Sequence, residues 1–125
     1  MGASRILVVD DEPLVAEMIR RTLEDDHEVA VAHSATEALA LLEAGRRYDA
    51  ILCDVQMPGL DGIELHQRLR EVYPDQAARM VFLSGGATTT RTRNFLASPG
   101  VRALDKPFRL GDLLARIAEL IGSRA

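Results

Sequence analysis

Five polar side chains lie at or just beyond the ends of short apolar segments of this sequence. They are Asp10, Asp11, Asp54, Ser84 and Lys106. Carboxylates brought close together repel one another by roughly a few kcal/mol per pair at an effective dielectric constant of about 20, so such a group needs a cation or a protonation shift to relieve it. A site built from oxygen ligands suits Mg²⁺. The lysine and the hydroxyl would add a positive charge and a hydrogen-bond donor for a phosphoryl group, and Asp54 could accept that group as a nucleophile.

The stretch Tyr48 to Gly62 carries the central residue of this set. Ala50–Cys53 is an apolar run without polar alternation, which is typical of a strand buried on both faces of a parallel sheet. Asp54 follows it, at the position where open α/β sheets bind ligands. Taken alone, Asp54 could equally be a residue that only caps the next turn.

The other apolar runs predict four further strands, over residues 5–10, 28–33, 80–83 and 101–104. Helical patterns separate them. After Pro13, apolar residues recur at helical spacing and Leu14 falls beside the stripe; the stripe consists of Val15, Met18, Ile19, Thr22 and Leu23. The segment 88–96 predicts a weak helix, and residues 110–121 predict a last amphipathic helix.

Two helices carry the spacing of a capping box at their start. Ser34 with Glu37 begins one that Gly45 ends, and Asp61 with Glu64 begins one that Pro74 ends. Strand and helix thus alternate five times with short links. This order predicts an α/β fold with one doubly wound, five-stranded parallel sheet and helices on both faces.

All strands of a parallel sheet point their C-terminal ends at one edge, so the five polar side chains should converge there. We expect residues 1–125 to form a single domain with its core over about residues 5–122. The composition is that of an ordinary globular protein, with 47% hydrophobic residues, a net charge of −4 and one cysteine, Cys53. The acidic balance argues against a nucleic-acid partner. No apolar run approaches the length of about 20 residues that a membrane span needs, so we expect a cytoplasmic domain.

Four motifs in this order, VVDDEP, CDVQMPGLDG, LSG and DKPF, resemble those of the response-regulator receiver domains of two-component signalling. The resemblance covers nearly the whole chain. It implies a flavodoxin-like fold with strand order 2-1-3-4-5, which the alternation alone does not give. It also implies a Lys106–Pro107 bond in the cis form.

The resemblance further implies a role for each matching residue. Asp54 matches the phosphoacceptor, Lys106 the lysine that binds the phosphoryl group, and Ser84 the switch hydroxyl. Asp11 matches the acid that binds Mg²⁺ directly, Asp10 the acid that supports the metal's water shell, and the Gln56 backbone carbonyl a further ligand. The implied partner is a histidine kinase or a phosphotransfer protein, and the chain would be a stand-alone regulator or the receiver of a hybrid histidine kinase. Beyond its own phosphorylation and dephosphorylation, such a receiver has no dedicated enzymatic activity.

One position departs from the family pattern. The switch aromatic of the family would fall at Ala103, which has no ring to move when Ser84 engages a phosphoryl group. We therefore expect phosphorylation to rearrange residues 84–87 and the start of the weak helix, with little change around Ala103. Leu14, together with Pro107 and Phe108 at the same edge of the sheet, is expected to form the docking surface for the kinase.

Two other functions share parts of this pattern. A flavodoxin-like electron carrier needs an amide-donating loop for the FMN phosphate after the first strand, where Asp10, Asp11 and Glu12 would repel it. An aspartate-nucleophile phosphatase usually carries a second acid two residues after the nucleophile, and Gln56 occupies that place.

Overall fold

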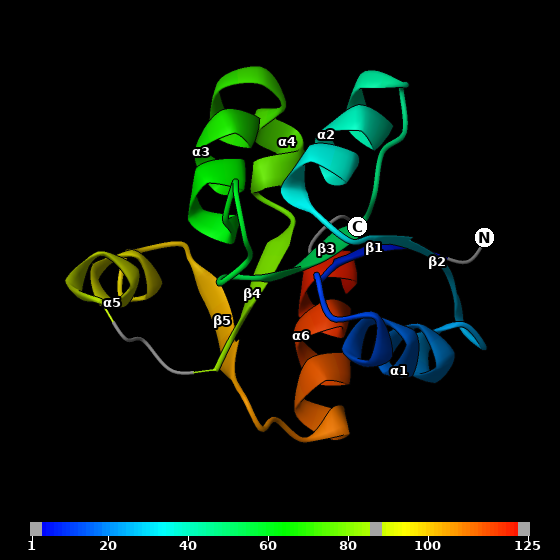
Figure 1. The fold of residues 1–125 in the computed structure, drawn as a ribbon. Coiled ribbons are helices and arrows are strands. Elements are labelled where there is room, and N and C mark those ends of the chain that lie inside the picture. The colour runs from blue at the N-terminus through cyan, green and yellow to red at the C-terminus, as the bar shows by residue number, and fades with distance from the viewer. Residues whose placement is uncertain (1–3, 86–88, 123–125) are drawn as a thin grey trace.

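Five strands form one parallel sheet in the order β2-β1-β3-β4-β5 in the computed structural model, which describes residues 4–85 and 89–122 (Figure 1). Every neighbouring pair of strands is parallel. The strands are β1 (Ser4–Val9), β2 (His27–Ala32), β3 (Ala50–Asp54), β4 (Met80–Ser84) and β5 (Arg102–Asp105). The predicted fold class and the strand order implied by the motifs are confirmed, with strand ends shifted by a residue.

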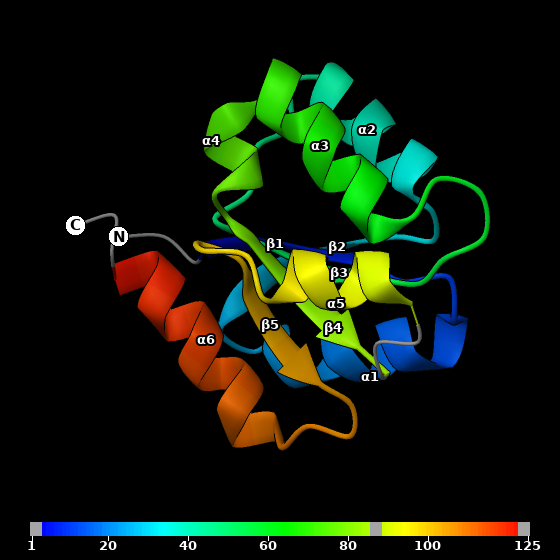
Figure 2. The same ribbon diagram turned by 90° about the vertical axis from the view of Figure 1, so that its left-hand side faces the viewer.

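Helices cover both faces of the sheet, as Figures 1 and 2 show. Helices α1 (Pro13–Leu23) and α6 (Leu110–Gly122) lie on one face, where their apolar side chains join a core with Val8, Leu52 and Val81. Helices α2 (Ala35–Glu43) and α3 (Gly62–Val72) cover the other face, and α5 (Thr90–Leu96) packs beside β5 on that same side. The two apolar layers bury β3 completely.

The capping signals are confirmed in full for α3 and in part for α2. Asp61 and Glu64 bond each other's backbone N–H groups in a complete capping box. Ser34 accepts a hydrogen bond from the Glu37 N–H at 3.1 Å, but the Glu37 carboxylate lies 3.4 Å from the Ser34 hydroxyl instead of returning to the Ser34 backbone. One capping bond therefore holds the start of α2.

The predicted stripe of α1 is wrong at one position. Ala16 is buried with Ile19 and Leu23, whereas Met18 is 58% exposed. The helix turns its small residue toward the sheet, since Ala16, Ile19 and Leu23 share one face at spacings of three and four. Leu14 lies outside this face, as expected, and is 86% exposed.

A short helix, α4 (Pro74–Ala77), was not predicted from the sequence. Pro74 ends α3, and it also begins this single-turn helix. Across residues 4–85 and 89–122, no helix is long and apolar enough to span a membrane.

Candidate functional site

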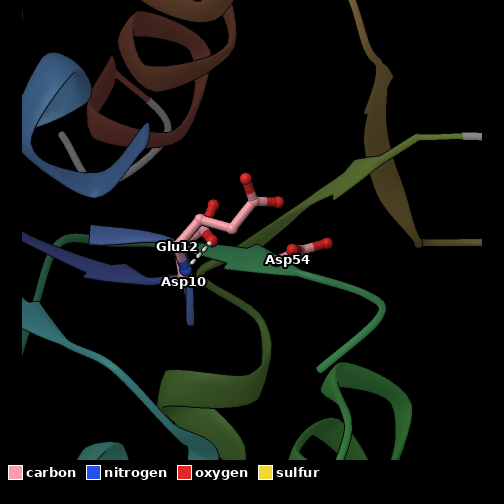
Figure 3. A group of neighbouring side chains, drawn as sticks. All are labelled: Asp10, Glu12 and Asp54. Carbon is pink, nitrogen blue, oxygen red and sulfur yellow. Dashed lines mark hydrogen bonds between the residues drawn. The ribbon is translucent and has the colours of Figure 1, made fainter. Parts of the chain in front are cut away.

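Two carboxylates meet at the C-terminal edge of the sheet because β1 and β3 are neighbours. Val9 of β1 pairs with Cys53 of β3 in the register. Asp10, the residue after β1, therefore lies at the same level as Asp54, the last residue of β3. Oxygen atoms of Asp10, Glu12 and Asp54 all lie within 4.8 Å of one another (Figure 3). Asp10 is fully buried and Asp54 is 5% exposed, so two of these charges lie in a poorly solvated place.

Asp10 is only partly satisfied by the protein. Its Oδ1 accepts a hydrogen bond from the Glu12 N–H at 2.9 Å, the bond drawn in Figure 3. Its Oδ2 is buried and finds no hydrogen-bond partner in the part of the chain that the structure describes. Burial raises the pKa of Asp10; the Glu12 N–H opposes this rise, and the negative charge of Asp54 adds to it.

Asp54 lies next to the positive charge of Lys106. The Lys106 Nζ is 3.5 Å from Asp54 Oδ2, and the Gln56 N–H donates to Asp54 Oδ1 at 3.2 Å. Burial raises the pKa of Asp54, while Lys106 and the Gln56 N–H partly offset that rise. The carboxylate is therefore positioned and partly neutralised by groups from two different loops.

The remaining predicted residues lie at the same edge. Ser84 is the last residue of β4 and is 1% exposed; its carbonyl accepts a 2.6 Å hydrogen bond from the Lys106 N–H. Asp11 is half-buried, and its charge helps to raise the pKa values of both Asp10 and Asp54. Gln56 is exposed beside Asp54. The Lys106–Pro107 peptide bond is cis, as the resemblance implied.

Glu12 is an acid of the site that was not predicted from the sequence. It is the N-cap residue of α1 but makes no side-chain capping bond. Its carboxylate instead joins Asp10 and Asp54. Its signal in the sequence is its place in the run of acids, Asp10 to Glu12, that follows the first strand.

This arrangement fits a hard divalent cation. It offers several carboxylate oxygens, one of them a buried Asp10 oxygen without a partner among the described residues. Burial and the negative charges of neighbouring acids raise the pKa values of Asp10 and Asp54, and a bound cation would favour their ionised forms. Oxygen ligands of this kind are those that Mg²⁺ prefers.

The family model of the response regulator receiver domain matches residues 6–118. This chain belongs to that family. Among curated proteins it is similar to the response regulator MprA of Mycobacterium avium (strain 104), with 39% identity over 118 residues. The match covers 94% of this chain but 50% of the regulator, so the chain spans about half the length of that relative.

Solved receiver domains have the same fold. A CheY-like response regulator receiver domain protein from Methanospirillum hungatei JF-1 is 27% identical, with a TM-score of 0.86 and coverage of 98% of this chain and 97% of that one. The signal receiver domain of a signal transduction histidine kinase from Syntrophus aciditrophicus is 27% identical, with a TM-score of 0.85 and coverage of 97% and 92%. The receiver domain of two-component signalling therefore occurs here in its complete five-stranded form.

Proposed function

We propose that Asp54 accepts a phosphoryl group from the phosphohistidine of a histidine kinase or a phosphotransfer protein, in a reaction that depends on Mg²⁺. The observation that carries this proposal is the position of Asp54, which is nearly buried between the acids at the end of β1 and the ammonium group of Lys106. A carboxylate fixed among charges of both signs is suited to attack a phosphoryl group whose oxygens are themselves negative.

In this reaction a carboxylate oxygen of Asp54 forms a bond to phosphorus as the bond from phosphorus to the donor nitrogen breaks. The donor imidazole keeps the electron pair of that bond and takes up a proton. Lys106, 3.5 Å from the carboxylate, stabilises the negative charge on the transferring oxygens. The Gln56 N–H holds the other carboxylate oxygen in place. The Ser84 hydroxyl donates to a phosphoryl oxygen once the group is attached.

Asp11, Asp10 and the Gln56 backbone carbonyl would hold Mg²⁺ with Asp54, and Glu12 lies close enough to the cluster to take part. Bound there, the ion would neutralise the carboxylates and the phosphoryl oxygens that must approach them. The partly unsatisfied carboxylate of Asp10 supports this assignment.

The chain would act as one part of a longer protein or of a multi-protein pathway, as two of the relatives suggest. The MprA regulator is about twice the length of the match, and the Syntrophus domain belongs to a histidine kinase. We infer a cytoplasmic location, where such a kinase would present its phosphohistidine. Neither a flavodoxin-like electron carrier nor an aspartate-nucleophile phosphatase gains support. Acidic residues follow β1, and Gln56 lies where the phosphatase would have its second acid.

The test is intact-mass analysis after incubation with a small phosphodonor, acetyl phosphate or phosphoramidate, with Mg²⁺. Wild type should gain one phosphoryl group and Asp54→Asn none. Asp25→Asn is the matched control, since Asp25 is an exposed residue after α1 and the charge change is the same. Equal labelling of wild type and Asp54→Asn would refute the assignment of the phosphoacceptor.

A second pair of variants tests the metal ligands. Asp11→Ala should abolish the Mg²⁺ dependence together with the labelling, because a ligand and part of the charge relief are lost at once. Glu12→Gln keeps the volume of the neighbouring acid and removes its charge, so it shows how far Glu12 contributes. Labelling of Asp11→Ala at the wild-type rate, with or without chelator, would contradict the proposed ligand set.

A further inference from the structure

Four arginines converge at the opposite edge of the sheet, where the parallel strands begin. Arg5 is the second residue of β1, Arg102 is the first residue of β5, Arg79 immediately precedes β4, and Arg47 lies three residues before β3. Since parallel strands all start at one edge, residues scattered over nearly 100 positions meet there, by the same rule that gathers the acids at the other edge. Together they line a cavity of about 700 Å³.

Arg47 is held in place by the backbone and by a ring. Its Nη1 donates to the Leu42 carbonyl at 3.0 Å, and its guanidinium lies over the ring of Tyr73, 4.7 Å from the ring centroid. A guanidinium fixed in this way has lost part of its conformational freedom before any ligand arrives. It still has further N–H groups to donate.

Arg79 and Arg102 are held in the same manner. The Arg79 Nη1 donates to the Leu120 carbonyl at 2.7 Å, and the Arg102 Nη1 donates to the Ala78 carbonyl at 3.2 Å. Neither of them, nor Arg47, forms an ion pair with a carboxylate anywhere in residues 4–85 and 89–122. Carbonyl oxygens orient these three cations without neutralising them.

Tyr48 contributes a second, independent observation. Its backbone N–H and carbonyl are both bonded by the side chain of Gln76, at 2.9 and 3.1 Å; Tyr48 is among the residues that line the cavity and is 7% exposed. Its hydroxyl oxygen is buried and has no hydrogen-bond partner among the described residues. An unsatisfied buried hydroxyl costs stability unless a ligand completes it.

The charge of this cavity is opposite to that of the chain. Its lining holds four guanidinium groups against the carboxylates of Asp49 and Asp75, whereas the whole chain has a net charge of −4. Arg5 is paired with Glu28 at 3.3 Å, but both side chains are more than half exposed, so that pair is weak and open to exchange. The cavity therefore attracts anions.

We propose that this cavity, between the starts of β1, β3, β4 and β5, binds a small phosphate-bearing anion. Guanidinium groups match phosphate oxygens with paired N–H donors, and three of them are already oriented by carbonyls. The volume lies within the range of about 300–1,000 Å³ that is typical of small-molecule sites. Because the cavity and Asp54 lie at opposite edges of the sheet, binding there requires neither Mg²⁺ nor phosphorylation.

The experiment is a titration of the ¹⁵N-labelled chain with inorganic pyrophosphate, at low ionic strength and without Mg²⁺. Amide shifts should centre on residues 47–49, 79 and 102. Arg79→Gln and Arg102→Gln should each weaken binding about tenfold, which corresponds to about 1.4 kcal/mol. Arg68→Gln is the matched control, because Arg68 is exposed on α3 outside this cavity, and it should bind as the wild type does.

Thermal unfolding of each variant without the probe separates lost binding from lost folding. If Arg79→Gln unfolds because its bond to Leu120 is gone, Arg102→Gln and Arg47→Gln decide the question. The proposal is overturned if no shifts occur at millimolar pyrophosphate, if the shifts centre on residues 10–12, 54 and 106, or if Arg68→Gln weakens binding equally. Tighter binding of citrate would assign a carboxylate ligand instead, and tighter binding of a glutamate-rich peptide would make the surface a protein-docking site.

Discussion

Replacing Asp10 with Asn should make the protein more stable in the absence of Mg²⁺. Asp10 is fully buried, and oxygen atoms of Asp10 and Asp54 lie within 4.8 Å. Asparagine has nearly the same shape, and its side-chain oxygen can keep the hydrogen bond from the Glu12 N–H. The substitution therefore removes one buried negative charge and little else.

The magnitude follows from the distance. Two unit charges 4.8 Å apart, the upper limit of this distance, repel by about 3.5 kcal/mol at an effective dielectric constant of about 20. Lys106 opposes the rise in the pKa of Asp10 and so recovers part of this energy. The new amide group is a donor and needs an acceptor, at a place where Asp10 Oδ2 finds no hydrogen-bond partner among the described residues. We expect a net gain of about 1 kcal/mol at pH 7, which is about 4 °C in Tm for a domain of this size.

The assay is urea or thermal unfolding at pH 7, with chelator and with millimolar Mg²⁺. Wild type should gain stability with Mg²⁺, by about 1.4 kcal/mol at a concentration ten times the dissociation constant, because the ion binds only the folded state. Asp10→Asn should be the more stable protein in chelator and should gain little from Mg²⁺. Asp25→Asn, at an exposed site, should change neither value by more than about 0.5 kcal/mol. A less stable Asp10→Asn in chelator, or an unchanged response to Mg²⁺, would refute the reasoning.

Three further outcomes are expected. Gly62→Ala should destabilise the fold by about 1–3 kcal/mol in urea unfolding and lower the labelling of Asp54, because a Cβ would stand 2.6 Å from the Asp54 carbonyl oxygen. The control is Gly111→Ala in α6, where a Cβ would meet open space and should cost no stability. Leu14→Asp, at a residue 86% exposed, should slow phosphotransfer from the cognate kinase and leave labelling by acetyl phosphate unchanged, whereas equal loss in both assays would indicate misfolding. Amide chemical-shift mapping with a phosphate mimic should give larger shifts at the start of α5 and at Phe95 than at residues 101–104. Shifts centred on β5, together with phosphate-dependent dimerisation in sedimentation, would contradict this.

The sequence was sufficient to predict most of the sheet because each strand is an apolar run that ends abruptly in polar residues. Ala50–Cys53 before Asp54 is the clearest case, and the structure buries all of it. The convergence of Asp10, Asp54 and Lys106 followed from parallel topology alone. The order of the strands did not, because alternation is compatible with several orders, and only the resemblance supplied it.

The missed features depend on side-chain direction and packing. Met18 has the spacing of the stripe, yet Ala16 takes the buried position beside Ile19 and Leu23. Glu12 was not predicted at the site, because nothing in the sequence shows where its side chain points. The meeting of the arginines at the strand starts was not predicted, although parallel strands bring their first residues to one edge just as they bring their last residues to the other. The expected rearrangement of residues 84–87 lies partly outside the described residues, which omit 86–88.

Ala103 on β5 carries no aromatic ring, but Phe95 on the neighbouring helix α5 does. Ala103 pairs with Phe82 in the register of β4 and β5, and Phe82 packs edge-to-face against Phe95 at 4.8 Å and against His66 at 5.5 Å. Phe95 also meets His66 at 5.4 Å, so three rings from β4, α5 and α3 form one cluster beside Ala103. A ring attached to α5 moves with that helix, whereas a ring on β5 must rotate against a fixed strand. A change at Ser84 that displaces α5 would therefore alter the contacts of Phe95 with α3, and the signal would leave the site through the helices instead of through the face of β5.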